Sequence, residues 1–422
     1  MLKEVDFDDP SASFRDKSTW EVGRALAILR LCGIDTFADN GEKLLCWVPE
    51  SLLRPTIYAQ FVGGDLEAEL RLAMRRAKEA GLKAMLAATM EEEIESHVAG
   101  PIDDQVLDRN SHRIARCVRL AAEEEGMGAL VQMKLSGLVR PKLLVSLGHA
   151  YSTKGLPVVE DIARQITDGK TSQVRMATLK SILTEEDKDA LLRAVGRLKM
   201  IGKEAEERGV SVLVDAESTP LNDGLSALTL AGAAAFNSAR PVIWNTYQCY
   251  LKDAERRVRH EYQLLKEGVG VCFGAKLVRG AYMMQERART PDPVCRDYKA
   301  TTDNYHRILS SLLEKCSPKC HMIAATHNEE SIQLVVKKLR GTDRSHVSFG
   351  QLYGMADHIS GPLARAGFSV HKSIPCGSVR EVLPYLARRA TENRALMEGA
   401  QRERALLATE MFSRARRALL RR

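Results

Sequence analysis

The 422-residue sequence lacks several features that mark particular classes of protein. Aromatic residues make up only 5% of it, and no apolar run approaches the roughly 18 residues of a membrane-spanning helix. We find no zinc-finger spacing, no aromatic platform for RNA and no basic stripe along the body of the chain. The sequence therefore predicts neither a membrane span nor a nucleic-acid partner.

The nine cysteines do not form the even set of a disulfide framework. Cys316 and Cys320, in CSPKC, are the only close pair, and their spacing is not that of a usual zinc knuckle. We expect nine free thiols in a reducing compartment and no metal site. The N-terminal stretch MLKEVDFDDPSASF is acidic and lacks the arginine-rich composition of a mitochondrial presequence, so composition assigns no cellular address.

The formal charge of +7 is concentrated at the C-terminal end of the chain. Residues 411–422, MFSRARRALLRR, contain five arginines and no acidic residue. This stretch is either a basic amphipathic helix that contacts an anionic membrane surface or a solvated terminal helix. The composition alone leaves both interpretations open.

Eight short apolar runs, separated by long helical patterns, follow a helical region over residues 1–80. The runs are KAMLAAT (83–89), ALVQMKL (129–135), VSVLVDAE (210–217), PVIWNTY (241–247), VCFGAKLVRG (271–280), HMIAATHN (321–328), HVSFGQL (346–352) and FSVHKSIP (368–375). Strands that alternate with helices pair in parallel, because parallel neighbours need a crossover. Parallel strands are buried on both faces, which explains why these runs show no clean polar alternation.

Eight such strands predict an α/β fold of the (β/α)₈ TIM-barrel type. We expect an N-terminal helical arm over 1–80, a catalytic barrel over 81–395 and a basic C-terminal helix over 396–422. An open doubly wound sheet is the structural alternative. Against it, the only glycine-rich candidate, GVGVCFG at 268–274, precedes a strand, whereas a dinucleotide fingerprint follows a strand and opens a helix.

Polar side chains collect at the C-terminal ends of the predicted strands. They are Lys134, Asp215, Glu217, Asn245, Gln248, Lys276, Arg279, Thr326, His327, Asn328, Gln351 and Ser373. Charged groups inside apolar runs are costly to bury unless they are paired. Because function lies at this end of the strands in a (β/α)₈ barrel, we expect the active site here.

The strand lysines leave more than one chemistry open. Lys134 or Lys276 is suited to form a Schiff base as the nucleophile of a lyase, or to clamp an anionic substrate or cofactor. Asp215 is placed to neutralise such a cation, as a structural partner or as a base. ATHNEES, at 325–331, offers donors at a helix N-terminus, where an anion site and simple capping by Asn328 are compatible.

The last predicted strand and helix, SIPCGSVREVLPYLARRATEN (373–393), contain two adjacent arginines. Tyr385, Arg388, Arg389 and Glu392 fall at i, i+3, i+4 and i+7, so they project from one helix face. Paired guanidinium groups grip a carboxylate in a bidentate manner, and Glu392 is placed to hold one of them. The alternative is a solvated ladder of arginine and glutamate.

Several of these stretches together resemble the proline dehydrogenase family, from about residue 5 to the C-terminus. They are QMKLSGL (132–138), VDAE (214–217), WNTYQCYLKDA (244–254), GAKLVRGAYMMQERA (274–288), ATHNEE (325–330), FGQLYGMADHIS (349–360) and IPCGSVREVLPYLARRATEN (374–393). KLVRGAY and YLARRATEN are highly specific in combination. The resemblance implies a distorted (β/α)₈ barrel that binds FAD at the C-terminal ends of its strands.

The resemblance also implies a substrate site that works by positioning, with no residue acting as an acid or a base. Arg388 and Arg389 bind the substrate carboxylate with help from Lys134, and Asp215 and Glu392 balance these cations. The groups implied to pack around the substrate ring are Leu277, Tyr282 and Tyr385.

The resemblance places a second set of residues around FAD. Near the isoalloxazine lie Lys276, Asn245 and Gln248. The remainder of the cofactor is lined by Arg279, Gly280, Thr326, His327, Asn328, Gln351 and Leu352.

One departure from the family pattern concerns the substrate. The position fifteen residues before Arg388 is a tyrosine in typical proline enzymes, and here it is Ser373. A serine opens space beside the ring and supplies a small polar group, so a hydroxylated ring fits better. KSIP, and VDFDDP with KSTWE near the start, resemble the hydroxyproline dehydrogenase branch. Tyr353, Ala356 and Cys376 also depart from the pattern and leave details of the cofactor pocket open.

We therefore predict an FAD-dependent oxidation of trans-4-hydroxy-L-proline to 1-pyrroline-3-hydroxy-5-carboxylate, with hydride transfer to flavin N5. The resemblance implies a membrane quinone as electron acceptor and a mitochondrial location at the matrix side of the inner membrane, with the basic C-terminal helix in contact with it. L-proline dehydrogenase is the nearest alternative. A Schiff-base lyase and a non-enzymatic scaffold at a membrane surface are the more distant ones.

Overall fold

The computed structural model describes residues 5–34, 41, 44–89, 103–168, 177–289, 291–395 and 397–420. Within these ranges the side chains of residues 168, 284–285, 388–395 and 397–400 lie outside the description. The chain divides into two compact units. The terminal unit comprises residues 1–95, 326–344 and 348–422, and the central unit comprises residues 96–325 and 345–347.

Eight strands form a closed barrel in the order of the sequence, β1 to β8. They are β1 (Lys83–Ala88), β2 (Leu130–Met133), β3 (Ser211–Val214), β4 (Ile243–Gln248), β5 (Phe273–Val278), β6 (Cys320–Ala325), β7 (Val347–Leu352) and β8 (Val370–Cys376). Each strand falls on one of the eight predicted runs. The (β/α)₈ prediction is confirmed, and the open doubly wound sheet is wrong because the strand order closes on itself.

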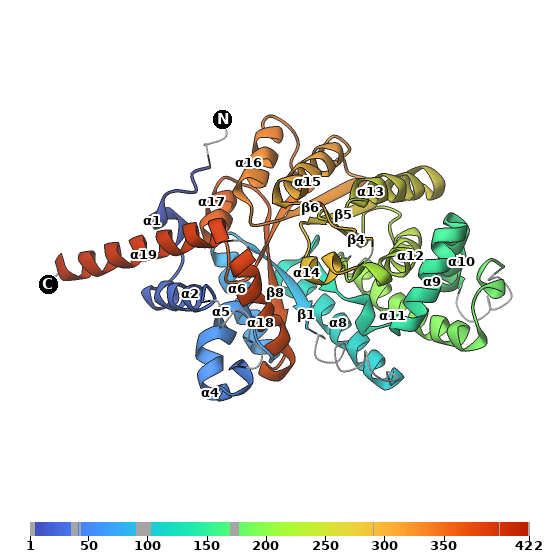
Figure 1. The fold of residues 1–422 in the computed structure, drawn as a ribbon, viewed down its shortest axis with the longest axis horizontal. Helices are drawn as coiled ribbons and strands as arrows, with labels where there is room; N and C mark the ends of the chain where they lie inside the picture. The colour runs from blue at the N-terminus through green and yellow to red at the C-terminus, as the bar shows by residue number, and fades with distance from the viewer. Residues whose placement is uncertain are drawn as a thin grey trace. The chain divides into compact units, whose positions relative to one another are not determined.

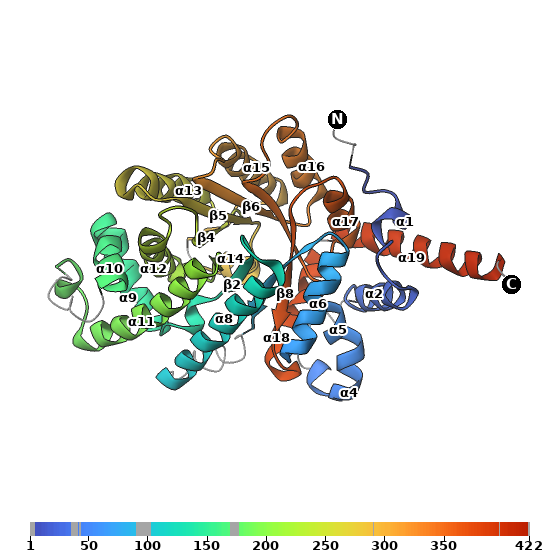
Figure 2. The same cartoon turned by 180° about the vertical axis from the view of Figure 1, so that it is seen from behind.

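The central unit holds β2 to β6 and the helices that follow them. These helices are α8 (Asp104–Glu125), α9 (Pro141–Lys154), α10 (Leu156–Asp168), α11 (Glu185–Glu207), α12 (Thr219–Phe236), α13 (Ala254–Gln263), α14 (Met283–Arg287) and α15 (Tyr298–Leu313). Short 3-10 or π turns are η2 (Leu135–Gly137), η4 (Leu179–Ser181) and η5 (Leu264–Val269). Helix α12 packs against α9 and α10 (Figures 1 and 2). This close approach needs Gly224, where a Cβ would lie 1.9 Å from the carbonyl oxygen of Leu144.

The terminal unit holds β1, β8, nearly all of β7 and the helices from both ends of the chain. These are α1 (Pro10–Ser13), α2 (Thr19–Leu31), α4 (Glu50–Leu53), η1 (Arg54–Tyr58), α5 (Ala59–Phe61), α6 (Glu67–Glu79), α16 (Glu329–Lys338), α17 (Asp357–Arg365), α18 (Val379–Ala395) and α19 (Met397–Leu420). Helix α19 packs along α1 and α2 (Figure 1). The core of this unit joins residues from α2, η1, α5 and α18 with Phe14 at the end of α1, and it includes Phe61, Val382 and Leu386.

The local sequence explains where the first helices begin. Ser18 caps α2 in a reciprocal capping box with Glu21, and α6 carries two acidic residues in its first turn and two basic residues in its last. Both helices lie within the region over residues 1–80 that was predicted to be helical. The predicted division at residues 80 and 395 stays a prediction.

No described helix is long and apolar enough to cross a membrane. No group of three or more histidine, cysteine or acidic side chains in the described part of the chain has a geometry that suits a metal ion. All nine cysteines are free thiols.

Candidate functional site

A buried ion pair lies at the C-terminal ends of β3 and β5 in the central unit. The Lys276 ammonium is 2.5 Å from the carboxylate of Asp215, and Lys276 is only 4% exposed. Strand β4 lies between these two strands, so the contact crosses the barrel interior. Burial of a lone ammonium is costly, and the pairing explains how a lysine is tolerated inside an apolar strand.

A second acid, Glu217, lies beside Lys134. Glu217 is buried and accepts hydrogen bonds from the backbone nitrogen of Ser136 at 3.1 Å and from the Ser136 hydroxyl. Burial raises the pKa of Glu217, while the nearby ammonium of Lys134 and these hydrogen bonds oppose the rise. Gln248 donates to the Glu217 carbonyl at 2.8 Å. The predicted cations Lys134 and Lys276 therefore each have a carboxyl group nearby in the central unit.

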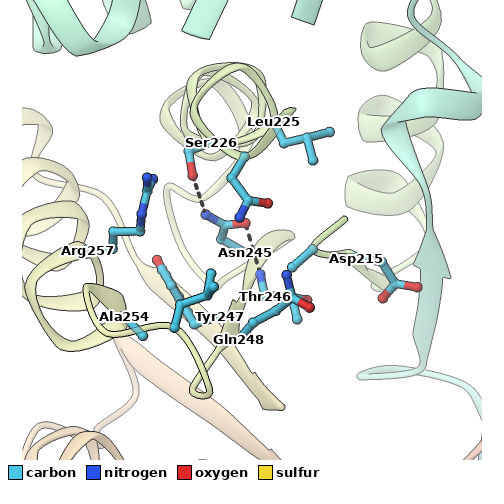
Figure 3. A pocket seen from close by; sticks show the side chains of 12 residues that line it. Asp215, Leu225, Ser226, Asn245, Thr246, Tyr247, Gln248, Ala254 and Arg257 are labelled. Atoms are coloured by element: carbon cyan, nitrogen blue, oxygen red, sulfur yellow. Dashed lines mark hydrogen bonds between the residues drawn. The ribbon is translucent and has the colours of Figure 1, made fainter. Parts of the chain in front are cut away.

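Asn245 points away from this ion pair, toward the helices (Figure 3). Its amide nitrogen donates to Ser226 on α12 at 3.2 Å and to Glu261 on α13 at 2.8 Å. Successive side chains of a strand alternate between faces, so Thr246, the register partner of Lys276, shares the inner face with it. The predicted place of Asn245 beside the isoalloxazine stays a prediction, and Thr246 and Gln248 occupy the face that Lys276 shares.

A small cavity lies between β4 and the helices α12 and α13 (Figure 3). Its volume is about 20 Å³, which is room for about one water molecule. Thr246 is among the residues that line the cavity, and its hydroxyl is buried with no hydrogen-bond partner among the described residues. The cavity is too small for an imino acid, so it is not the substrate site.

Arg279 follows the end of β5, and one terminal nitrogen of its guanidinium has no hydrogen-bond partner among the described residues. Its guanidinium donates to Thr302 at 2.6 Å and stacks over the ring of Tyr298 at 4.5 Å. The other terminal nitrogen, Nη1, is buried, and no described group accepts a hydrogen bond from it. A buried guanidinium nitrogen without a partner is costly unless an acceptor arrives, and an anionic ligand supplies one.

The residues after Arg279 bring the backbone close to an aromatic ring. Gly280 has a φ of +133°, and a Cβ there would lie 1.4 Å from the ring of Tyr250. Tyr282 precedes α14, and its carbonyl accepts from the backbone nitrogen of Glu286. Leu277 is fully buried and lies beside Tyr247 on the outer face of the sheet. The predicted packing of Leu277 and Tyr282 on a substrate ring stays a prediction.

In the terminal unit, the predicted cofactor residues after β6 and β7 bond to one another. His327 Nε2 accepts from the backbone nitrogen of Leu352 at 3.0 Å, so this nitrogen carries no proton. Gln351 donates to the carbonyl of Thr326 at 3.4 Å. Asn328 caps α16 through its bond to the backbone nitrogen of Ser331 at 2.8 Å, which confirms the capping interpretation.

Ser373 lies in the middle of β8, which continues to Cys376, so it does not end the strand as predicted; it is 8% exposed. Its Cα is in register with Met85 of β1 and with Leu352 of β7. Tyr385 is buried in the terminal core with Val382 and Leu386. The side chains of Arg388, Arg389 and Glu392 lie outside the described residues, although the backbone of this segment is helical in α18.

Two charged groups near these sites were not among the predicted site residues. Glu217 stood in the list of polar strand ends, but nothing in the sequence distinguished it from Asp215. Lys372 precedes Ser373 inside β8, and its ammonium is 2.9 Å from Asp357. The sequence signal for this ion pair was a lysine within an apolar strand run. Its partner, Asp357, lies fifteen residues earlier, and only the fold brings the two side chains together.

The comparison with family models agrees with this geometry. The model described as proline dehydrogenase matches residues 67–402. The chain belongs to the proline dehydrogenase family. It is therefore an oxidoreductase of the proline and hydroxyproline dehydrogenase group, and acts on an imino acid.

Relatives within the proline dehydrogenase family include proteins named hydroxyproline dehydrogenase. That of Xenopus laevis is 37% identical over 424 residues, which cover 95% of this chain and 88% of the relative. That of Bos taurus is 38% identical and covers 95% of this chain and 92% of the relative. Human "Proline dehydrogenase 1, mitochondrial" is 31% identical over 543 residues, covering 98% of this chain and 90% of the relative.

Solved structures with the family fold are similar to this chain at low sequence identity. Proline utilization A from Bdellovibrio bacteriovorus, inactivated by N-propargylglycine, matches 91% of this chain with a TM-score of 0.63 and 18% identity. A proline utilization A with proline bound in remote sites matches 95% with a TM-score of 0.60 and 20% identity. The chain spans 38% and 44% of those two longer chains, and the likeness shows the fold alone.

Proposed function

We propose that this chain is a hydroxyproline dehydrogenase, which oxidises trans-4-hydroxy-L-proline to 1-pyrroline-3-hydroxy-5-carboxylate. The observation that carries the proposal is Ser373, a small and largely buried hydroxyl residue in the middle of β8. A serine leaves room for a ring hydroxyl and gives it a hydrogen-bonding partner, whereas a tyrosine occupies that space. The relatives named hydroxyproline dehydrogenase, at 35–38% identity, support the same choice over human proline dehydrogenase 1 at 31%.

We propose FAD as the cofactor, and the residues present fit it. The unpartnered Nη1 of Arg279 suits an anionic portion of the cofactor, and the Gly280 backbone leaves no room for a side chain beside Tyr250. In the terminal unit, the proposed cofactor contacts are the strand-end residues Thr326, His327, Asn328, Gln351 and Leu352. When bound, FAD supplies the hydride acceptor at its N5 atom.

The chain's own residues would act by binding and orienting the substrate. Lys134, beside the buried Glu217, would assist in binding the substrate, and Lys276, held by Asp215, would lie near the isoalloxazine of FAD. Arg388 and Arg389 would hold the substrate carboxylate, with Glu392 orienting one guanidinium. Fixed geometry of this kind lowers the barrier by roughly several kcal/mol, so no acid or base is required from the protein.

We further propose that electrons pass to a quinone and that the enzyme works at the matrix side of the mitochondrial inner membrane. The name of the human relative, "Proline dehydrogenase 1, mitochondrial", supports the compartment. Helix α19 supports contact with a membrane surface, because Phe412, Leu419 and Leu420 are exposed on a helix that carries several arginines.

One preparation of the purified protein tests this proposal. Flavin absorption bands are expected, with kcat/KM higher for trans-4-hydroxy-L-proline than for L-proline when a soluble dye accepts the electrons. A preference for L-proline would replace the proposal with proline dehydrogenase activity. A colourless protein that borohydride links to its substrate through Lys134 or Lys276 would instead favour a Schiff-base enzyme.

A further inference from the structure

A buried cluster of charged side chains in the terminal unit joins the two ends of the chain to β8. Lys372 is 2% exposed, and its ammonium lies 2.9 Å from the Asp357 carboxylate at the start of α17. The second oxygen of Asp357 lies 3.0 Å from the ammonium of Lys17, in the segment before α2. The proposed reaction uses none of these groups, although buried charges are costly to retain.

The cluster holds the turn between β7 and α17, residues 353–356. Lys372 donates to the carbonyl of Met355 at 2.5 Å, and Glu403 of α19 accepts from the backbone nitrogens of Ala356 and Asp357 at 2.9 and 3.0 Å. Ala356 has a φ of +53°, the only left-handed non-glycine residue in the described part of the chain. Such a conformation is unfavourable for alanine, so the contacts from Lys372 and Glu403 stabilise a turn that its own sequence does not favour.

This turn is bonded directly to Ser373. The backbone nitrogen of Tyr353 donates to the carbonyl of Ser373 at 3.0 Å, and Leu352 pairs with Ser373 in the β7–β8 register. The preceding residue, Lys372, also donates to the carbonyl of Leu352 at 3.4 Å. The position of Ser373 is therefore fixed by the same turn that Lys17 and Glu403 hold from the two ends of the chain.

The charges of this cluster support one another: burial lowers the pKa of Lys372, and the neighbouring carboxylate of Asp357 opposes that fall. Burial opposes ionisation of Asp357, but Lys17 and Lys372 hold the pKa of its carboxyl below the usual value. Burial likewise opposes ionisation of Glu403, and the neighbouring His358 holds its pKa below the usual value. Its ion pairs and hydrogen bonds make the cluster a brace for the 353–356 turn.

We propose that Lys17 and Glu403 are positioning residues for substrate discrimination. Lys17 acts through Asp357, and Glu403 acts through the 353–356 turn, and both set where Ser373 meets the substrate ring. The inference rests on the proposed function in one respect, the contact between Ser373 and the ring. It adds that the N-terminal arm and α19, distant in sequence from β8, tune which ring is oxidised.

The test compares the ratio of kcat/KM for trans-4-hydroxy-L-proline to that for L-proline, with a soluble dye acceptor, in four variants. Lys17→Met and Glu403→Gln are expected to lower this ratio about threefold to tenfold, because a small displacement at the reacting ring has a large effect on rate. Lys17→Arg keeps the ion pair with Asp357 and is expected to restore most of the ratio. Glu410→Gln is the matched control, since Glu410 is also a buried acid of α19 but binds Arg414 and Arg417 instead of the turn.

Hydrogen exchange of the 353–357 amides in the same variants separates this inference from the proposed function. Faster exchange is expected in Lys17→Met and Glu403→Gln but not in Glu410→Gln. If the wild-type protein prefers L-proline, the proposed function fails, while a shifted ratio together with faster exchange still supports the inference. An unchanged ratio in Glu403→Gln, or an equal shift in Glu410→Gln, would overturn the inference. Either result would mean that the cluster only stabilises the fold and does not position Ser373.

Discussion

Lys276 of β5 and Asp215 after β3 form a buried ion pair, with 2.5 Å between nitrogen and oxygen, across the intervening strand β4. The pair brings together two residues that are 61 positions apart in the sequence. It also fixes the ammonium group on the inner face of the barrel, where we propose that the isoalloxazine of FAD lies.

Removal of one partner from this pair is expected to destabilise the protein. Asp215→Asn leaves the Lys276 ammonium buried without a countercharge. We expect the free energy of unfolding to fall by about 2 kcal/mol, less than for a fully buried ion pair, because the side chain of Asp215 is partly exposed. Denaturant unfolding measures the change. Asp303→Asn, which breaks an exposed pair with Lys299, is the control and should have no measurable effect. Equal effects in the two variants would contradict the role of burial.

Replacement of Ser373 by the larger tyrosine is expected to change the preferred substrate. Ser373→Tyr fills the space proposed for the ring hydroxyl, so the kcat/KM ratio should shift toward L-proline by about tenfold or more. Steady-state kinetics with both substrates measures the shift. Ser373→Thr keeps the hydroxyl and is expected to retain the original preference. An unchanged ratio in a folded Ser373→Tyr variant would refute the role of this residue.

Arg279→Met is expected to weaken FAD binding. The substitution removes both the stacking on Tyr298 and the unpartnered Nη1 donor, and we expect Kd for FAD to rise by about tenfold or more. Titration of the flavin-free protein with FAD, followed by flavin fluorescence, gives the value. Arg296→Met is the matched control, because Arg296 is exposed and pairs with the adjacent Asp297. Equal affinities in both variants would exclude Arg279 from the cofactor site.

The stability of the protein is expected to fall as the pH rises from about 6.5 to 9, because of His358. Burial lowers its pKa, but Glu329 and Glu403 outweigh burial and raise the pKa to about 9. Because the pKa is higher in the folded than in the unfolded protein, protonated His358 contributes fully to stability below the unfolded pKa of about 6.5. This contribution decreases as the pH rises and is lost as the pH passes about 9. The shift corresponds to about 3 kcal/mol.

Unfolding measured by denaturant at several pH values across this range tests the prediction. The variant His358→Gln cannot take up a proton, so its stability should change less between pH 6.5 and 9 than that of the wild-type protein. The same slope in both proteins would assign the pH dependence to other groups.

Much of the fold was predictable from local sequence. Each strand run is apolar on both faces because parallel strands are covered on both sides, and the helical patterns between the runs require the crossovers that make the pairing parallel. The same logic placed Lys134, Asp215, Lys276 and Arg279 at strand ends. Local pattern did not tell which face of a strand end a side chain occupies: Asn245 bonds to the helices, whereas its neighbour Thr246 shares the face of Lys276.

The sequence by itself determined the barrel, the family and the rim of polar strand ends, because these depend on periodicity and on motifs that are short along the chain. Only the tertiary structure decided how the charges pair. Lys276 meets Asp215, Lys372 and Lys17 both meet Asp357, and Glu403 reaches the left-handed Ala356. A charge in the interior is too costly without a partner, so each buried charge lies close to an opposite charge in the folded structure. The distance between two residues along the chain does not show which charges become neighbours in this way.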